Sequence, residues 1–68
     1  MTVIEGFRRI QKHWPEARFQ MAHGEQLEVM HQRLRELATG PEPETMRDLI
    51  RRMDEVGLGV RGKTVILA

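Results

Sequence analysis

Apolar side chains recur along most of this chain at spacings of three and four residues, which is the period of an amphipathic helix. Glycine and proline separate three such segments, and we expect helices over residues 3–14, 25–38 and 43–56. Their apolar stripes are Val3, Phe7, Ile10 and Trp14; Leu27, Met30, Leu34 and Leu37; and Met46, Leu49, Ile50, Met53 and Val56. The pattern therefore predicts three helices that pack around one core.

The period changes after the third helix. Gly57 is expected to end that helix, because glycine readily adopts the left-handed conformation that closes a last turn. Residues 58–60 and 63–67 then follow the pattern of two short strands around a tight glycine turn at Arg61-Gly62. We therefore expect a hairpin over residues 58–67, and a fold that is mainly α with a small C-terminal β-hairpin.

The segment between the first two helices has no clear period. We expect residues 15–24 to form a loop from which Phe19 and Met21 reach the core. An isolated hairpin is only marginally stable in water, so the C-terminal hairpin needs a partner. Thr2 to Glu5 fits a capping box at the start of the first helix, although residues 2–4 are also a candidate for a third strand.

Length and composition limit the class of protein. The chain has 68 residues, 40% of them hydrophobic and 31% charged, which is typical of one soluble globular domain over residues 1–68. It contains no cysteine, so packing rather than a disulfide or a thiolate zinc site must hold it folded. No run of residues is apolar enough to span a membrane, and we expect a cytoplasmic protein with no membrane partner. A homodimer remains open.

The sequence offers no recognisable catalytic set. His13, His23 and His31 lack a metal-ligand spacing, and no serine has a partner histidine and acid. Residues 57–64 match the phosphate-binding pattern G-x-x-x-x-G-K-[ST], but that loop must leave a strand and open a helix, whereas here it leaves a helix and enters a strand-like run. We expect no enzyme activity, no cofactor and no metal.

Residues 44–58 resemble the third helix of winged helix-turn-helix DNA-binding domains, and Arg61 to Leu67 is similar to their wing. Together with residues 34–38, as the end of the preceding helix, the resemblance covers residues 34–67. It implies a three-helix winged-helix-like domain that regulates transcription, with the third helix in the major groove of double-stranded DNA and the hairpin as the wing. A homodimer would double a small contact area.

Six residues are the expected DNA contacts: Thr45, Arg47, Arg51 and Arg52 on the third helix, and Arg61 and Lys63 on the hairpin. Arginine is the commonest reader of guanine in the major groove, and cations at a hairpin tip suit the phosphate backbone. The alternative is structural. The helix arginines would then pair with acids, Asp48 with Arg52 and Arg51 with Glu55, and the hairpin cations would only protect a sheet edge.

Net charge weighs against a simple DNA-binding protein, because 11 Lys and Arg against 10 Asp and Glu leave only +1. The densest basic cluster, residues 8–13, is expected to be a solvated outer face. The alternative function is a small phage or mobile-element adaptor or inhibitor, possibly replication-related, that binds a protein through a helical groove. Trp14-Pro15 and residues 26–30 are similar to the N-terminal helical domain of phage replication helicase loaders. An exposed apolar patch between the first two helices would favour this protein-binding alternative over DNA binding.

Overall fold

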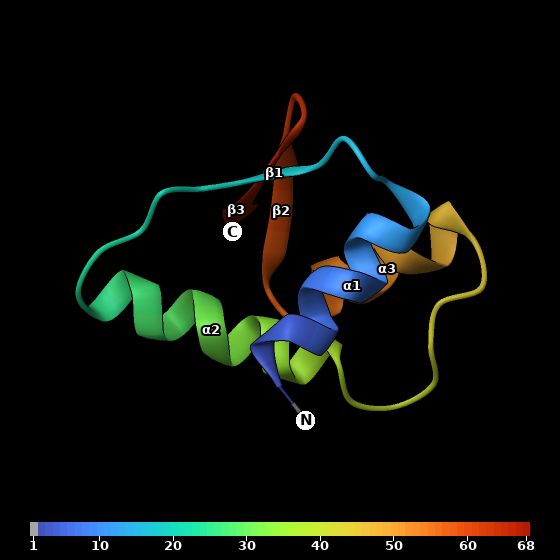
Figure 1. Ribbon diagram of the computed structural model, residues 1–68, viewed down its shortest axis with the longest axis horizontal. Coiled ribbons are helices and arrows are strands. Elements are labelled where there is room, and N and C mark those ends of the chain that lie inside the picture. Colours follow the sequence, from blue (N-terminus) through green and yellow to red (C-terminus); the bar gives the residue numbers. More distant parts are fainter. Residues whose placement is uncertain (1) are drawn as a thin grey trace.

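The computed structural model describes residues 2–68, so Met1, which the predicted domain includes, lies outside the described residues. Three helices and a three-stranded sheet make up the fold (Figure 1). In chain order the elements are α1 (Val3–His13), β1 (Arg18–Phe19), α2 (Glu25–Leu37), α3 (Met46–Glu55), β2 (Leu58–Arg61) and β3 (Thr64–Leu67). The prediction of a mainly α fold with a C-terminal hairpin is confirmed.

The sheet has the strand order β1-β3-β2. β2 and β3 form the predicted antiparallel hairpin, and Gly62 in its turn has the left-handed φ of 62° that glycine tolerates best. β1 pairs with β3 in parallel, along the other edge of that strand. The expectation of a loop at residues 18–19 is therefore wrong, since this segment supplies the partner that the hairpin needs.

Residues 2–4 do not form the third strand. The hydroxyl of Thr2 accepts a hydrogen bond from the Glu5 N–H at 3.2 Å and caps α1, as the capping-box pattern predicts. One N–H group at the start of α1 is thereby satisfied. Val3 and Ile4 belong to this helix and not to the sheet.

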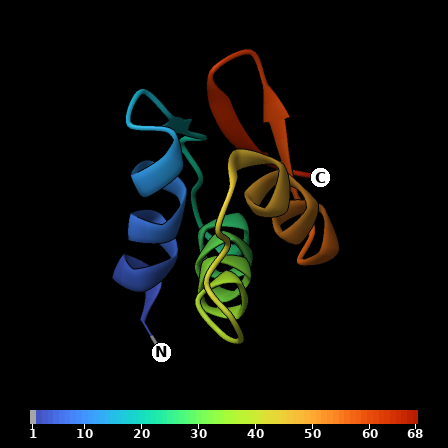
Figure 2. The same cartoon turned by 90° about the vertical axis from the view of Figure 1, so that its right-hand side faces the viewer.

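The core lies where the three helices meet the inner face of the sheet (Figure 2). Its most buried large side chains, each less than 2% exposed, are Ile10, Leu34, Leu37, Leu49, Met53, Leu58 and Val65. Three apolar residues expected to pack inside lie on the surface instead: Ile50 is 50% exposed, Leu27 39% and Met21 83%. Ile50 and Leu27 lie at the margins of their stripes, and Met21 follows β1 in the segment that crosses to α2.

α1 and α2 approach each other closely at Gly6, which is buried in the first half of α1. A Cβ added to Gly6 would overlap the carbonyl oxygen of Leu34 and lie 2.9 Å from its carbonyl carbon. The neighbour is α2 main chain, which cannot swing away as a long side chain can. Glycine at this position therefore sets the distance between the two helices.

α3 begins later than expected, at Met46 rather than at residue 43. Thr45 adopts an extended conformation and its hydroxyl caps the helix. Pro43, expected in the first turn, is buried ahead of the helix, and its carbonyl oxygen lies 2.8 Å from Nε2 of His13. This contact with the end of α1 keeps the residues before Thr45 out of the helix. The predicted stop at Gly57 is confirmed, with φ of 87°.

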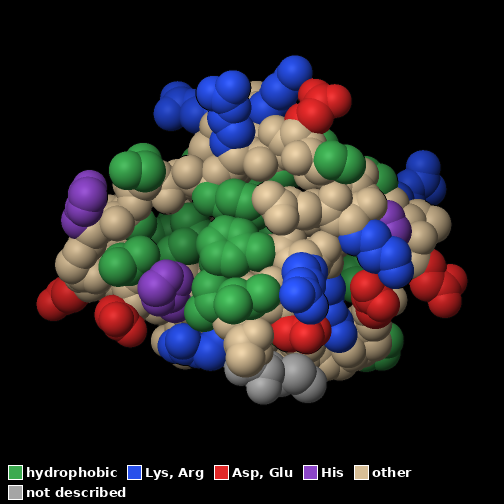
Figure 3. All heavy atoms as spheres, viewed as in Figure 1, with side chains coloured by type: hydrophobic (Ala, Val, Ile, Leu, Met, Phe, Trp, Pro, Cys, Tyr) green, Lys and Arg blue, Asp and Glu red, His purple; other side chains and the backbone are tan. Residues whose placement is uncertain are grey.

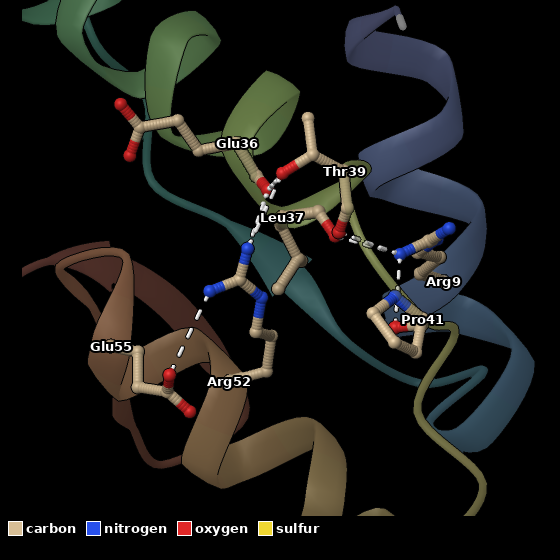
Figure 4. A network of polar contacts seen from close by, with 7 residues as sticks. All are labelled: Arg9, Glu36, Leu37, Thr39, Pro41, Arg52 and Glu55. Atoms are coloured by element: carbon tan, nitrogen blue, oxygen red, sulfur yellow. Dashed lines mark hydrogen bonds and ion pairs between the residues drawn. The ribbon is translucent and has the colours of Figure 1, made fainter.

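Arg9 of α1 binds the end of α2 (Figure 4). Its guanidinium donates four hydrogen bonds to main-chain carbonyls, those of Leu37, Thr39, Gly40 and Pro41, at 3.1, 3.2, 3.2 and 3.4 Å. The last carbonyls of a helix lack intrahelical partners and carry partial negative charge, so a cation is favourable there. The expectation of a solvated outer face is thus wrong for Arg9.

Candidate nucleic-acid interface

Arg47 and Arg51 lie four residues apart on the outward face of α3, because burial of Leu49 and Met53 turns that face to solvent. Among residues 2–68, no hydrogen bond or ion pair engages the side chain of Arg47. Arg51 reaches Asp48 at 3.5 Å, with the two side chains 73% and 37% exposed. Exposed pairs of this kind contribute little free energy, so a phosphate or a base edge is able to replace the carboxylate.

Thr45, the third predicted contact of this helix, has a structural task. Its Oγ1 accepts a hydrogen bond from the Asp48 N–H at 3.1 Å, while the residue itself stays exposed. An accepting hydroxyl keeps its own O–H for a second partner. The cap and a contact to a ligand are therefore compatible at this residue.

Loss of this cap gives a stability prediction. Thr45→Ala is expected to lower the free energy of unfolding by about 1 kcal/mol, the usual effect of removing an N-cap hydroxyl. For a domain of this size the thermal midpoint then falls by about 4 to 8 °C. Thr45→Ser keeps the hydroxyl and should unfold close to the wild-type midpoint in the same circular dichroism melt. Equal midpoints for the alanine and serine variants would contradict the capping role.

Arg52 differs from its neighbours, because its guanidinium points back into the molecule (Figure 4). It donates to the carbonyl oxygen of Glu36 at 3.1 Å and to Oγ1 of Thr39 at 3.3 Å, and it lies 3.8 Å from the carboxylate of Glu55. Its side chain is only 31% exposed. These contacts give Arg52 the task of holding α3 against the end of α2, and make it the least available of the predicted DNA contacts.

The acid pairs on α3 differ from the expected ones. Arg51 contacts Asp48, and Arg52 contacts Glu55, both at a spacing of three residues rather than four. Asp48 lies in the first turn of α3, where the positive end of the helix favours a carboxylate. The net charge of α3 is zero, since the helix contains three arginines and three acidic residues: Arg47, Arg51 and Arg52, and Asp48, Asp54 and Glu55.

A groove of about 510 Å³ runs between α3 and the segment that precedes it. Its lining has four acidic residues, two arginines and two prolines: Pro41, Glu42, Pro43, Glu44, Asp48, Arg51, Arg52 and Glu55. An acidic wall disfavours a phosphate backbone on this side of the helix. Arg51 belongs to this lining, whereas Arg47 does not.

Arg61 and Lys63 flank the hairpin turn, and both are exposed. The side chain of Arg61 has no ion-pair or hydrogen-bond partner among residues 2–68. Lys63 lies 3.3 Å from the carboxylate of Glu16, with the two side chains 69% and 72% exposed. The pair is weak because water surrounds both partners. Both hairpin cations are thus accessible to an anion.

Arg18 was missed by the sequence interpretation. It lies on β1 beside the end of β3 that follows the hairpin turn. Its N–H donates to the carbonyl oxygen of Lys63 at 2.8 Å. The sequence signal is the apolar-polar-apolar order of Ala17, Arg18 and Phe19, which in the structure are buried, exposed and half-buried. That alternation is too short to distinguish a strand from a loop without the pairing partner.

Comparison with protein-family models, with curated proteins and with solved structures finds no match to this chain. Across residues 2–68, no helix has the length and apolar character needed to cross a bilayer. In the same part of the chain, no three His, Asp or Glu side chains come together as a possible metal site.

Proposed function

We propose that this chain is a small winged-helix-like DNA-binding domain that regulates transcription, with α3 in the major groove and the β2–β3 hairpin as the wing. The observation that carries the proposal is the exposed pair Arg47 and Arg51 on the outward face of α3, followed directly by a hairpin whose turn carries two further cations. An α-helix fits the major groove, and a guanidinium is able to bind guanine through two hydrogen bonds.

Two features of the architecture support this proposal. α2 precedes α3 and is fixed to it through Arg52, which binds the last turn of α2, so that α3 is a rigid element rather than a free helix. The hairpin continues from α3 through the single residue pair Val56-Gly57, and β1 extends the sheet to three strands. A rigid helix and a supported hairpin pre-organise the contacts, which lowers the entropy lost on binding.

Electrostatics limit the affinity of one copy. α3 itself carries no net charge, and the whole chain carries only +1. Single modules of this size bury little surface on DNA, and a second copy would double both the buried area and the phosphate contacts. We therefore propose that a homodimer is the form that binds a specific site.

The test is fluorescence anisotropy of the purified chain on a random duplex of about 20 base pairs over a series of salt concentrations. Wild-type binding should weaken steeply as salt rises, because phosphate contacts release counterions. Arg47→Gln/Arg51→Gln should weaken binding and change the preference among selected sequences. The matched control is Arg8→Gln/Arg35→Gln, which removes two exposed arginines of α1 and α2 that have no ion-pair partner among residues 2–68. No wild-type binding at low salt, or equal loss in the control, would contradict the proposal.

A protein-binding module is the second candidate, and one observation favours it. Hydrophobic side chains gather on the face framed by α1, α2 and the segment between them (Figure 3). Exposed apolar residues of these elements include Ile4 at 63%, Met21 at 83% and Leu27 at 39%. Exposed apolar surface of this kind often marks a contact with another protein. Absence of DNA binding in the experiment above would make this candidate the stronger one.

A further inference from the structure

Three residues form a row across the sheet beside the hairpin turn. Thr64 of β3 pairs with Arg18 of β1 on one side and with Arg61 of β2 on the other. Residues directly opposite one another in neighbouring strands point to the same face of a sheet. The adjoining residue Val65 is fully buried and faces the core. The row therefore points outward, away from the core.

Both arginines of the row are exposed, and within residues 2–68 neither side chain has an ion-pair or hydrogen-bond partner. With about 4.8 Å between neighbouring strands, their Cα atoms lie about 10 Å apart, on either side of the Thr64 hydroxyl. Lys63 adds a third cation in the adjoining turn, where Glu16 is its one acidic contact among residues 2–68, at 3.3 Å. Two unpaired like charges on one face add nothing to folding stability, and both guanidinium groups are open to an anionic ligand.

The charge of the molecule is concentrated at this end of the sheet. Arg18, Arg61 and Lys63 against Glu16 give three minus one, or +2, whereas the rest of the chain has eight basic and nine acidic residues, or −1. Figure 3 shows Lys and Arg side chains gathered beyond the strands, at the hairpin end, with one acidic side chain beside them. A polyanion is attracted most strongly to this end, since α3 is electrically balanced.

We propose that Arg18, Arg61 and Lys63, together with the Thr64 hydroxyl, form a three-strand basic surface that binds the phosphate backbone of duplex DNA. This inference rests on the proposed function and adds to it a residue of β1, so that the wing contact is made by the whole sheet and not by the hairpin alone. Cations on β1, on β2 and in the hairpin turn suit a polymer with repeated charges better than a single anionic ligand. Arg and Lys contact phosphate oxygens as cations, and Thr64 donates its O–H.

The three-strand basic surface and α3 have different tasks on this proposal. Contacts to phosphates position a protein without reading sequence, whereas contacts to base edges specify the site. The basic surface therefore supplies most of the salt-dependent attraction, and Arg47 and Arg51 supply the sequence preference. The two sets of residues are distinguishable by experiment.

The experiment measures anisotropy on the same random duplex over a salt series for Arg18→Gln, Arg61→Gln and the double variant. Each single change should reduce the slope of log K against log salt by about 1, and the double change by about 2, equally on all duplex sequences. The control is again Arg8→Gln/Arg35→Gln, and all variants should keep the wild-type thermal midpoint. Glutamine retains most of the side-chain stem and removes only the charge.

The outcomes separate this inference from the proposed function. Wild-type slope and affinity in Arg18→Gln, together with a loss in Arg47→Gln/Arg51→Gln, would overturn the three-strand basic surface and leave DNA binding by α3 intact. A wild-type chain that shows no salt-dependent binding would overturn both. A fluorescent polyglutamate peptide is the second probe, and tighter binding to it than to the duplex would assign the surface to an acidic protein and overturn the inference.

Discussion

Replacing Gly6 by alanine is expected to lower the thermal midpoint of this protein by about 8 to 16 °C. The direction is opposite to the usual one, because alanine stabilises an ordinary helix interior by about 1 kcal/mol relative to glycine. At Gly6 the added Cβ overlaps the carbonyl oxygen of Leu34, and the main chain of α2 has to move away. Overpacking against main chain is expected to cost about 3 kcal/mol, the upper end of the usual range, which leaves a net loss of about 2 kcal/mol after the gain in helix propensity.

The matched control for Gly6→Ala is Gln11→Ala, an exposed position of the same helix. That change should alter the free energy of unfolding by no more than about 0.5 kcal/mol. Circular dichroism melts and urea titrations of both variants measure the difference. A higher midpoint for Gly6→Ala would mean that α1 and α2 do not approach each other at this residue.

Removing both arginines that bind the end of α2 is the second large effect. Arg9→Met/Arg52→Met is expected to lower the free energy of unfolding by about 2 to 3 kcal/mol, since hydrogen bonds from charged donors each contribute about 1.5 to 3 kcal/mol and water replaces part of that. Arg9 comes from α1 and Arg52 from α3, and both donate to Thr39, Arg9 to its carbonyl oxygen and Arg52 to its Oγ1. Methionine keeps an apolar stem, so the change reports mainly on the lost hydrogen bonds.

A double-mutant cycle with the two single variants measures how far the arginines act together. We expect them to be coupled, because they fix the same turn from opposite sides (Figure 4). Arg8→Met/Arg35→Met removes two exposed arginines without such contacts and should change stability little. If the Arg9 and Arg52 double variant were as stable as this control, the carbonyl contacts would have no energetic weight.

The same contacts guide the reading of DNA-binding data. A variant at Arg52 weakens the packing of α3 against α2, so loss of DNA binding in it does not identify a direct contact. Arg47 and Arg51 are free of this ambiguity, because their side chains make no hydrogen bond or ion pair with the other helices in residues 2–68. Variants at these two positions, with midpoints checked by melting, are the informative ones.

The sequence pattern predicted those elements whose formation depends on residues within a few positions of one another. The helical period located α1, α2 and most of α3, because a helix that packs on a core must repeat its apolar side chains every three to four residues. Gly57 marked the end of α3 for a conformational reason that is also local. The period did not show how wide each buried stripe is, and Ile50 and Leu27 were therefore placed inside although they are partly exposed.

β1 and the roles of individual cations depend on partners that are distant along the chain. β1 has only two residues, which are too few to show a strand-like alternation, and its partner strand β3 lies far away in sequence. The same is true of Arg9 and Arg52, which looked like solvated or DNA-binding cations until their acceptors were known. Arg47, Arg51, Arg61 and Lys63 were predicted from sequence and are exposed, whereas Arg18 entered the candidate interface only through strand pairing.

By itself, the sequence determined that this chain forms three amphipathic helices followed by a hairpin, because apolar spacing and glycine act through the nearest turns of the backbone. The tertiary structure alone decided which of its arginines bind carbonyls at helix ends and which face solvent. A guanidinium is recruited by whatever acceptors lie within hydrogen-bond reach, and those acceptors are supplied here by other elements. The separation of structural cations such as Arg9 from exposed ones such as Arg18 is therefore a property of packing.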